Sequence, residues 1–234
     1  VFFPKDQPSG KIEYYSVNGA DLSRFLDADT SYSEINDKIL SLFKGDTASL
    51  TENAVELSKG LRILRQDFWE ALCSFIISQN NNIPRIKKNV ASISARFGNK
   101  IENTDFYAFP SPKALIEAGV EGLNDCRLGV RTKYILHACH MLLSGEITET
   151  HLSSLSNAEA KEYLMKINGV GPKVASCALL YGAHRLSEVP VDIWMKKVFN
   201  KYFGSDFAEL GEYGGILQQY LFFRERFIIE GKKT

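Results

Sequence analysis

The segment Gly169-Val170-Gly171-Pro172-Lys173 combines residue types that suit phosphate binding and attack by an amine. Two glycines around a small apolar residue allow the positive backbone dihedrals of a tight hairpin between two helices. Pro172 is favourable in the first turn of the second helix. The hairpin amides then point outward at the N-terminus of that helix, which suits a phosphate oxygen. A plain helix–helix connection fits the same Gly-x-Gly pattern. A nucleotide-binding P-loop fits poorly, because its glycine and Lys-Ser/Thr spacing is missing.

Lys173 occupies the first turn of the second helix. The positive end of the helix dipole disfavours an ammonium group, so this position favours a neutral amine, which is a competent nucleophile. The alternative is a lysine that reaches solvent or pairs with a DNA phosphate.

A carboxylate follows about one helix downstream, in Val189-Pro190-Val191-Asp192. The proline makes this segment extended, and Asp192 then starts a helix predicted over Ile193–Phe203. Asp192 is either a simple N-cap or a carboxylate that the returning chain brings near the lysine. In the second role it would stabilise a cationic sugar and assist proton movement.

Gln218 and Phe222 lie four residues apart on a predicted final helix and therefore share one face. An amide can read the edge of a nucleic-acid base and an aromatic ring can stack on it. A mixed buried face is the alternative interpretation of this pair.

The elements that must position these residues are almost all predicted to be helices from about Ala20 onward. Residues 1–20 alternate weakly and indicate a strand or hairpin remnant. Helix starts and stops are marked by Asp67 with a reciprocal Glu70, by Pro84 with a stop at Gly98, by Ser111-Pro112, and by the capping box Ser156-x-x-Glu159.

The composition predicts a folded chain and gives no sign of a metal or redox cofactor. Hydrophobic residues make up 44% of the sequence, which suffices for a sizeable core. Lys plus Arg equals Asp plus Glu at 28 each, which argues mildly against nucleic acid but does not exclude a charge cluster on one face. The four cysteines form no CxxC pair, so an iron–sulfur cluster or zinc site is not expected.

No apolar run reaches the ~20 residues that cross a bilayer, and no signal peptide is visible. Isolated cysteines in apolar surroundings suit a reducing compartment. We therefore expect an intracellular protein, in the cytoplasm or nucleoid of a prokaryote or in a eukaryotic nucleus.

Together these motifs resemble the helix-hairpin-helix DNA glycosylase superfamily, and within it the bifunctional 8-oxoguanine glycosylase/AP lyases. The resemblance extends from about Leu64 to Phe222. It rests on Leu64-Arg65-Gln66-Asp67, Ser78 through Arg85, Gly169 through Ala175, and Val189 through Asp192. It implies a mainly helical fold with a remnant of an N-terminal antiparallel β domain.

The resemblance also implies a role for individual residues. Lys173 matches the Schiff-base lysine, and Asp192 matches the acid that supports cleavage of the glycosidic bond. Asn80 matches the residue that fills the gap left by the flipped base. The DNA-binding set it implies is Asn80, Arg85, Val130, Arg131, Gly169, Val170, Gly171 and Trp194, and the damaged-base pocket is Cys177, Gln218 and Phe222.

Two positions depart from the family pattern. Val130 stands where a tyrosine commonly wedges beside the orphaned base, so discrimination of the opposite base is expected to be weaker. Trp194 stands where a histidine commonly lies near a phosphate.

The resemblance predicts three parts: residues 1–60 as the tail of an N-terminal α+β domain, 61–172 as a central helical domain ending in the hairpin, and 173–234 as a C-terminal helical domain. The active site is expected at the junction. The expected partner of this monomer is duplex DNA that contains an oxidised purine, preferably opposite cytosine.

Three other functions fit parts of the pattern. A non-catalytic helix-hairpin-helix module would use the hairpin only to hold phosphates. A monofunctional glycosylase for alkylated bases would use water as nucleophile, and Lys173 counts against it. A helical protein-interaction domain leaves the hairpin and the Val-Pro-Val-Asp segment unexplained together.

Overall fold

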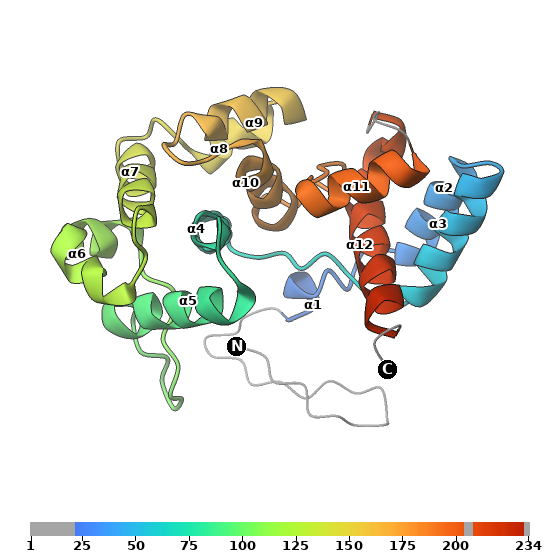
Figure 1. The fold of residues 1–234 in the computed structure, drawn as a ribbon. Coiled ribbons are helices and arrows are strands. Elements are labelled where there is room, and N and C mark those ends of the chain that lie inside the picture. The colour runs from blue at the N-terminus through green and yellow to red at the C-terminus, as the bar shows by residue number, and fades with distance from the viewer. Residues whose placement is uncertain (1–21, 204–207, 232–234) are drawn as a thin grey trace.

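The computed structural model describes residues 22–203 and 208–231 of the 234-residue chain and is mainly helical there, as the sequence predicts (Figure 1). Within these residues, β pairing is limited to one antiparallel bridge between Lys100 and Tyr107. The predicted strand remnant at residues 1–20 lies outside the described residues. The α-helices are α1 (Leu22–Phe25), α2 (Tyr32–Ser41), α3 (Asp46–Leu57), α4 (Phe68–Ser78), α5 (Ile83–Phe97), α6 (Pro112–Leu123), α7 (Arg131–Leu143), α8 (Glu149–Ser154), α9 (Asn157–Met165), α10 (Pro172–Cys177), α11 (Ile193–Tyr202) and α12 (Gly214–Gly231).

Short-range capping sets several helix ends where the sequence predicts them. Asp67 accepts a hydrogen bond from the amide of Glu70, although the reciprocal bond expected from Glu70 is not formed. Ser156 and Glu159 form the complete capping box of α9. Gly98 ends α5, and α11 ends one residue earlier than predicted. These signals work because each cap needs only residues a few positions apart.

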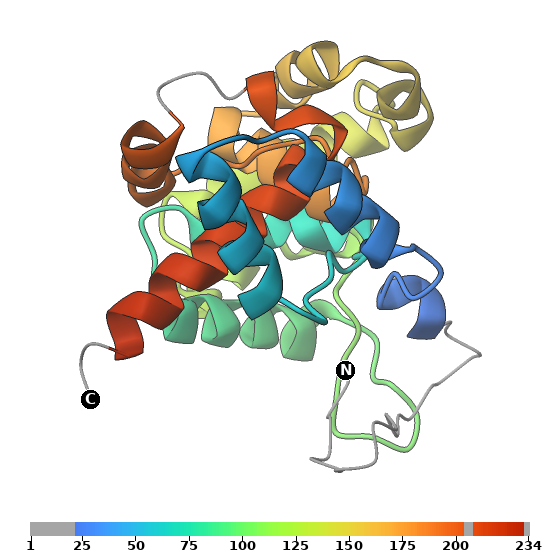
Figure 2. The same ribbon diagram turned by 90° about the vertical axis from the view of Figure 1, so that its right-hand side faces the viewer.

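Two hydrophobic clusters form the core. The first is built around α4 and includes the fully buried Leu72 and Ile76, with residues of α5 through α10 packed on them. The second joins α2 and α3 to α11 and α12, and Figure 2 shows α3 lying along α12.

A π-helical turn, η2 (Ala178–Gly182), follows α10 directly and belongs to both clusters. Leu179 is buried in the first cluster and its neighbour Leu180 in the second. The boundary between the clusters therefore lies immediately after the helix that carries Lys173.

The buried carboxylate of Asp27 connects three segments of the chain. It accepts hydrogen bonds from Thr30 (2.7 Å), Tyr32 (3.0 Å) and Nε of Arg65 (2.8 Å), and His184 Nε2 lies 3.2 Å away. Burial alone would raise the pKa of Asp27, but the hydrogen bonds from Thr30 and Arg65 and the nearby His184 together hold it below its ordinary value. Asp27 thus fixes the chain before α2 against the segments that precede α4 and follow η2.

Asp27→Asn is expected to lower the free energy of unfolding by about 2 kcal/mol at about pH 7, because Arg65 loses a charged, buried acceptor. Because the pKa of Asp27 is lower in the folded state than its ordinary value of 3.8, the ionised carboxylate stabilises the fold at any pH above 3.8. This stabilisation is lost as the pH falls through the lower pKa of the folded state. Urea unfolding should therefore show the difference from wild type shrinking toward about pH 3. The exposed Asp29→Asn is the matched control; an Asp27→Asn effect that is independent of pH would show that the charge is not responsible.

Candidate active site

The predicted hairpin is formed between α9 and α10. Gly169 has φ of 80°, and a Cβ atom there would lie 2.3 Å from the ring of Tyr134, so both conformation and close packing require glycine. The amide of Val170 donates to the carbonyl of Ile167 at 2.9 Å. Gly171 is the N-cap residue of α10.

The hairpin amides are not equivalent as candidates for binding a phosphate. The amide of Val170 is already used within the turn, and its side chain is buried in the first cluster. The amides of Gly169 and Gly171 donate to no described residue. These two amides are therefore the ones that can donate hydrogen bonds to a phosphate oxygen.

Lys173 lies in the first turn of α10, half-buried, with its Nζ 5.5 Å from the ring centroid of Phe75 on α4. Phe75 stacks in turn on Tyr181, with 5.4 Å between ring centroids. At 5.5 Å from the ring centroid, the amine lies over Phe75 in a cation–π contact. α4 and η2 thus provide the surroundings of the predicted nucleophile.

Cys177 lies one helical turn after Lys173 and is buried. Burial raises the pKa of the Cys177 thiol to about 11, against the opposing effect of the charge and hydrogen bond of Lys173; the charge of Asp192 raises it further. The charges of the Lys173 amine and of the Asp192 carboxylate therefore both act on the Cys177 thiol, so both residues lie near Cys177.

Asp192 is the N-cap of α11, as one interpretation of the sequence holds. Its backbone is extended, and its Oδ1 accepts a hydrogen bond from the amide of Met195 at 2.7 Å. The other carboxylate oxygen accepts from no described residue. The cap therefore orients the carboxylate and leaves one oxygen available.

Residues that the sequence reasoning missed hold the loop that delivers Asp192. The buried carboxylate of Glu188 pairs with Lys161 on α9 at 3.2 Å. The guanidinium of Arg185 donates to Asn157 Oδ1 at 3.0 Å. A Cβ atom at Gly215 would lie 2.4 Å from the carbonyl oxygen of Glu188. The adjacent glycines 214 and 215 are the one local signal of this close approach.

A pocket of about 360 Å³ lies between α10 and this loop. Its lining includes Lys173 and Ser176 on one side and Glu188, Val189 and Val191 on the other. The extended segment that leads to Asp192 therefore forms a wall beside the lysine.

Two of the three residues predicted to line the base pocket, Gln218 and Phe222, lie on α12, whereas Cys177 ends α10. Gln218 is buried, and Nε2 of Gln219 donates to its Oε1. The ring of Phe222 meets Trp194 edge to face, with 5.1 Å between centroids. Trp194, expected at the DNA surface, thus contacts a predicted pocket residue.

The loop after α4 carries Asn80, which is exposed and has φ of 46°. Arg131 holds the backbone of this loop with two hydrogen bonds. Its Nε donates to the carbonyl of Gln79 at 3.0 Å, and its Nη2 donates to the carbonyl of Asn80 at 3.2 Å. Arg85 and Val130 are exposed beside it. In this structure the guanidinium of Arg131 positions the loop backbone.

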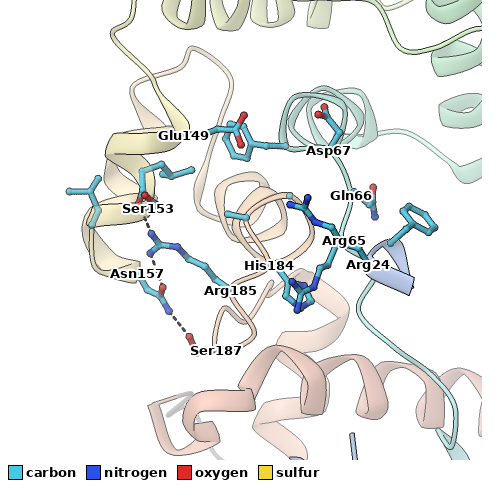
Figure 3. Close-up of a pocket in the computed structure, with 16 residues that line it drawn as sticks. Arg24, Arg65, Gln66, Asp67, Glu149, Ser153, Asn157, His184, Arg185 and Ser187 are labelled. Carbon is cyan, nitrogen blue, oxygen red and sulfur yellow. Dashed lines mark hydrogen bonds between the residues drawn. The ribbon is translucent and has the colours of Figure 1, made fainter. Parts of the chain in front are cut away.

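A larger pocket, of about 840 Å³, contains neither Lys173 nor Asp192 (Figure 3). Glu149 and Asp67 both line it, and burial, followed by the charge of Asp67, raises the pKa of Glu149 (Figure 3). The guanidinium of Arg185 in this pocket is bound by its neighbours. The volume of a pocket therefore does not identify the candidate active site in this structure.

Among the described residues, no group of three or more His, Cys, Asp or Glu side chains is arranged to hold a metal ion. The four cysteines are buried and unpaired. No helix in the described ranges is long and apolar enough to cross a membrane.

Sequence comparison relates this chain to DNA repair proteins. A probable N-glycosylase/DNA lyase of Methanothermobacter thermautotrophicus is 30% identical over 255 residues, covering 95% of this chain and 76% of the relative. An N-glycosylase/DNA lyase of Saccharomyces cerevisiae is 38% identical over 154 residues, covering 60% of this chain. The chain spans only 41% of the length of that yeast relative.

Structure comparison gives the same relationship. An 8-oxoguanine glycosylase/lyase of Clostridium acetobutylicum, solved with double-stranded DNA containing cytosine opposite 8-oxoguanine, superposes with a TM-score of 0.77 at 34% identity. The match covers 87% of this chain and 73% of the other. Residues 73–210 also match the model of a family described as HhH-GPD superfamily base excision DNA repair protein, so this chain belongs to the HhH-GPD superfamily.

Proposed function

We propose that this chain is a bifunctional DNA glycosylase/AP lyase that excises 8-oxoguanine from duplex DNA, preferably opposite cytosine. The observation that carries the proposal is that Lys173, just after the hairpin, lines one pocket with the extended segment that leads to Asp192, and that both charges act on the nearby Cys177 thiol. The relatives named N-glycosylase/DNA lyase and the Clostridium acetobutylicum enzyme support the same reaction. It would act as a monomer wherever the cell keeps its DNA.

Binding comes first in the proposed mechanism. The target base must leave the stack before any group can reach its sugar, at a cost of a few kcal/mol. The amides of Gly169 and Gly171 would bind a backbone phosphate. Asn80 would fill the vacated position and Arg85 would hold the partner base. Gln218 would then read the edge of the extruded purine and Phe222 would stack on it.

The chemical steps belong to Lys173 and Asp192. The neutral amine attacks C1′ of the deoxyribose, and the electron pair of the breaking glycosidic bond leaves with the base. Loss of the amine protons and opening of the sugar ring give an imine. The imine makes the 2′ hydrogen acidic, so its removal expels the 3′ phosphate by β-elimination. The free oxygen of Asp192 stabilises the positive charge that develops on the sugar.

Borohydride should link the protein covalently to duplex DNA that contains 8-oxoguanine, because it reduces the imine on Lys173. Lys173→Gln should give no covalent complex, whereas the exposed Lys113→Gln should trap like wild type. Gel electrophoresis of the denatured products measures the yield. Undiminished trapping by Lys173→Gln would assign the nucleophile to another residue, and duplex binding by a wild type that never traps would indicate a non-catalytic module.

Asp192→Asn separates the catalytic role of this residue from its structural role. Asparagine is as good an N-cap as aspartate, so α11 keeps its bond from Met195 while the charge is lost. We expect base excision to slow by about 10²–10³-fold under single-turnover conditions. Affinity for a duplex with an abasic-site analogue should stay at the wild-type level. A large loss of affinity, or an unchanged rate, would make Asp192 a structural cap only.

A further inference from the structure

A second concave surface lies between α5 and the 3₁₀ turn η1 (Asn124–Cys126). It is a groove of about 540 Å³, and its lining does not include Lys173 or Asp192. The residues that line it are Arg85, Lys88, Asn89, Ser92, Asp125, Cys126 and Arg127. Three of the seven carry a positive charge.

The basic side chains come from both walls of the groove. Arg85 and Lys88 are three residues apart on α5, so they lie on one face of the helix, and Ser92 continues that face one turn later. Both basic residues are exposed. Arg127, also exposed, stands on the opposite wall immediately after η1. The groove therefore presents cations from two directions.

A buried asparagine fixes the two walls against each other. Asn89 Nδ2 donates to the carbonyl of Cys126 at 2.6 Å. Its Oδ1 accepts from Nδ2 of Asn81 at 3.3 Å, which ties the groove to the loop that carries Asn80. Arg127 itself has φ of 55°, in the left-handed region that side chains other than glycine rarely occupy. Glycine would adopt this backbone conformation without strain, but the position carries the long cationic side chain of Arg127.

The charges of the groove are not neutralised from within. Its one carboxylate, Asp125, pairs with Arg96 at 3.1 Å. The hydroxyl of Ser92 is directed to the sulfur of Cys126 at 3.6 Å. In the described part of the chain, Arg85, Lys88 and Arg127 form no ion pair. Such a surface fits an extended polyanion, although the whole chain has no net charge.

We propose that this groove binds backbone phosphates of the undamaged DNA strand through Lys88 and Arg127. The inference rests on the proposed glycosylase function, which places Arg85 at the orphaned partner base. The groove begins at that arginine and continues along α5, so the strand that carries the partner base would run into it. Val130 is exposed; if it wedges beside the partner base, as the proposed function implies, its side chain is small, and phosphate contacts farther along would hold the strand instead.

The test compares duplex and single-stranded DNA with the same abasic-site analogue, using fluorescence anisotropy over a series of salt concentrations. Lys88→Ala/Arg127→Gly removes both cations, and glycine accepts the backbone conformation of residue 127. Lys59→Ala/Lys113→Ala is the control with the same loss of charge at exposed sites outside the groove.

The groove variant should bind the duplex about tenfold more weakly than the control variant, and its salt slope should fall by about two, one per phosphate lost. Its binding to the damaged single strand should match the control, and so should borohydride trapping on a single strand that carries a true abasic site, whose aldehyde can form the imine. If the two variants bind the duplex equally and the wild type traps normally, the proposal that the groove binds phosphates is wrong, but the glycosylase proposal stands. Equal losses on duplex and single strand overturn the assignment to the undamaged strand. A wild type that neither binds nor traps lesion DNA overturns both proposals.

Discussion

The return of the chain from η2 to α11 is the constraint on which the site depends. Lys173 on α10, the proposed nucleophile, and Asp192 at the start of α11 come near each other only if this loop takes one path. The buried Glu188–Lys161 pair ties the loop to α9, and the absence of a side chain at Gly215 lets α12 approach its carbonyl groups. Loss of Lys161 would leave the buried carboxylate of Glu188 without its counter-charge, which is costly, so this pair helps to hold the path.

The location of the site follows from how the core is divided. Leu179 and Leu180 are neighbours in sequence but belong to different clusters, so the two clusters meet just beyond α10. At this boundary an amine can be half-buried, against Phe75 on one side, and still border a pocket. A site deep within either cluster would desolvate both the amine and the carboxylate without giving DNA access to them.

The proposed DNA surface is organised by hydrogen bonds from buried or half-buried polar side chains to backbone carbonyls. Arg131 holds the loop of Asn80, and Asn89 holds the turn that carries Arg127. Both loops have residues with positive φ, which surrounding bonds must maintain. The exposed side chains of these loops are thereby attached to a backbone that is held in place. Less conformational entropy would then be lost when they bind DNA.

The sequence by itself determined what depends on neighbours a few residues apart: the caps at Asp67, Ser156 and Asp192, the glycine turn before Lys173, and hence the helical character of the described chain. It also carried the family resemblance that the comparisons confirm. Only the tertiary structure decided the contacts between distant segments, such as Asp27 with Arg65 and His184, and Glu188 with Lys161. Such contacts depend on the path of the chain between them, which no local spacing records. Arg131 illustrates the same limit. The sequence shows that this residue is a cation, but it does not show which carbonyl groups the guanidinium binds.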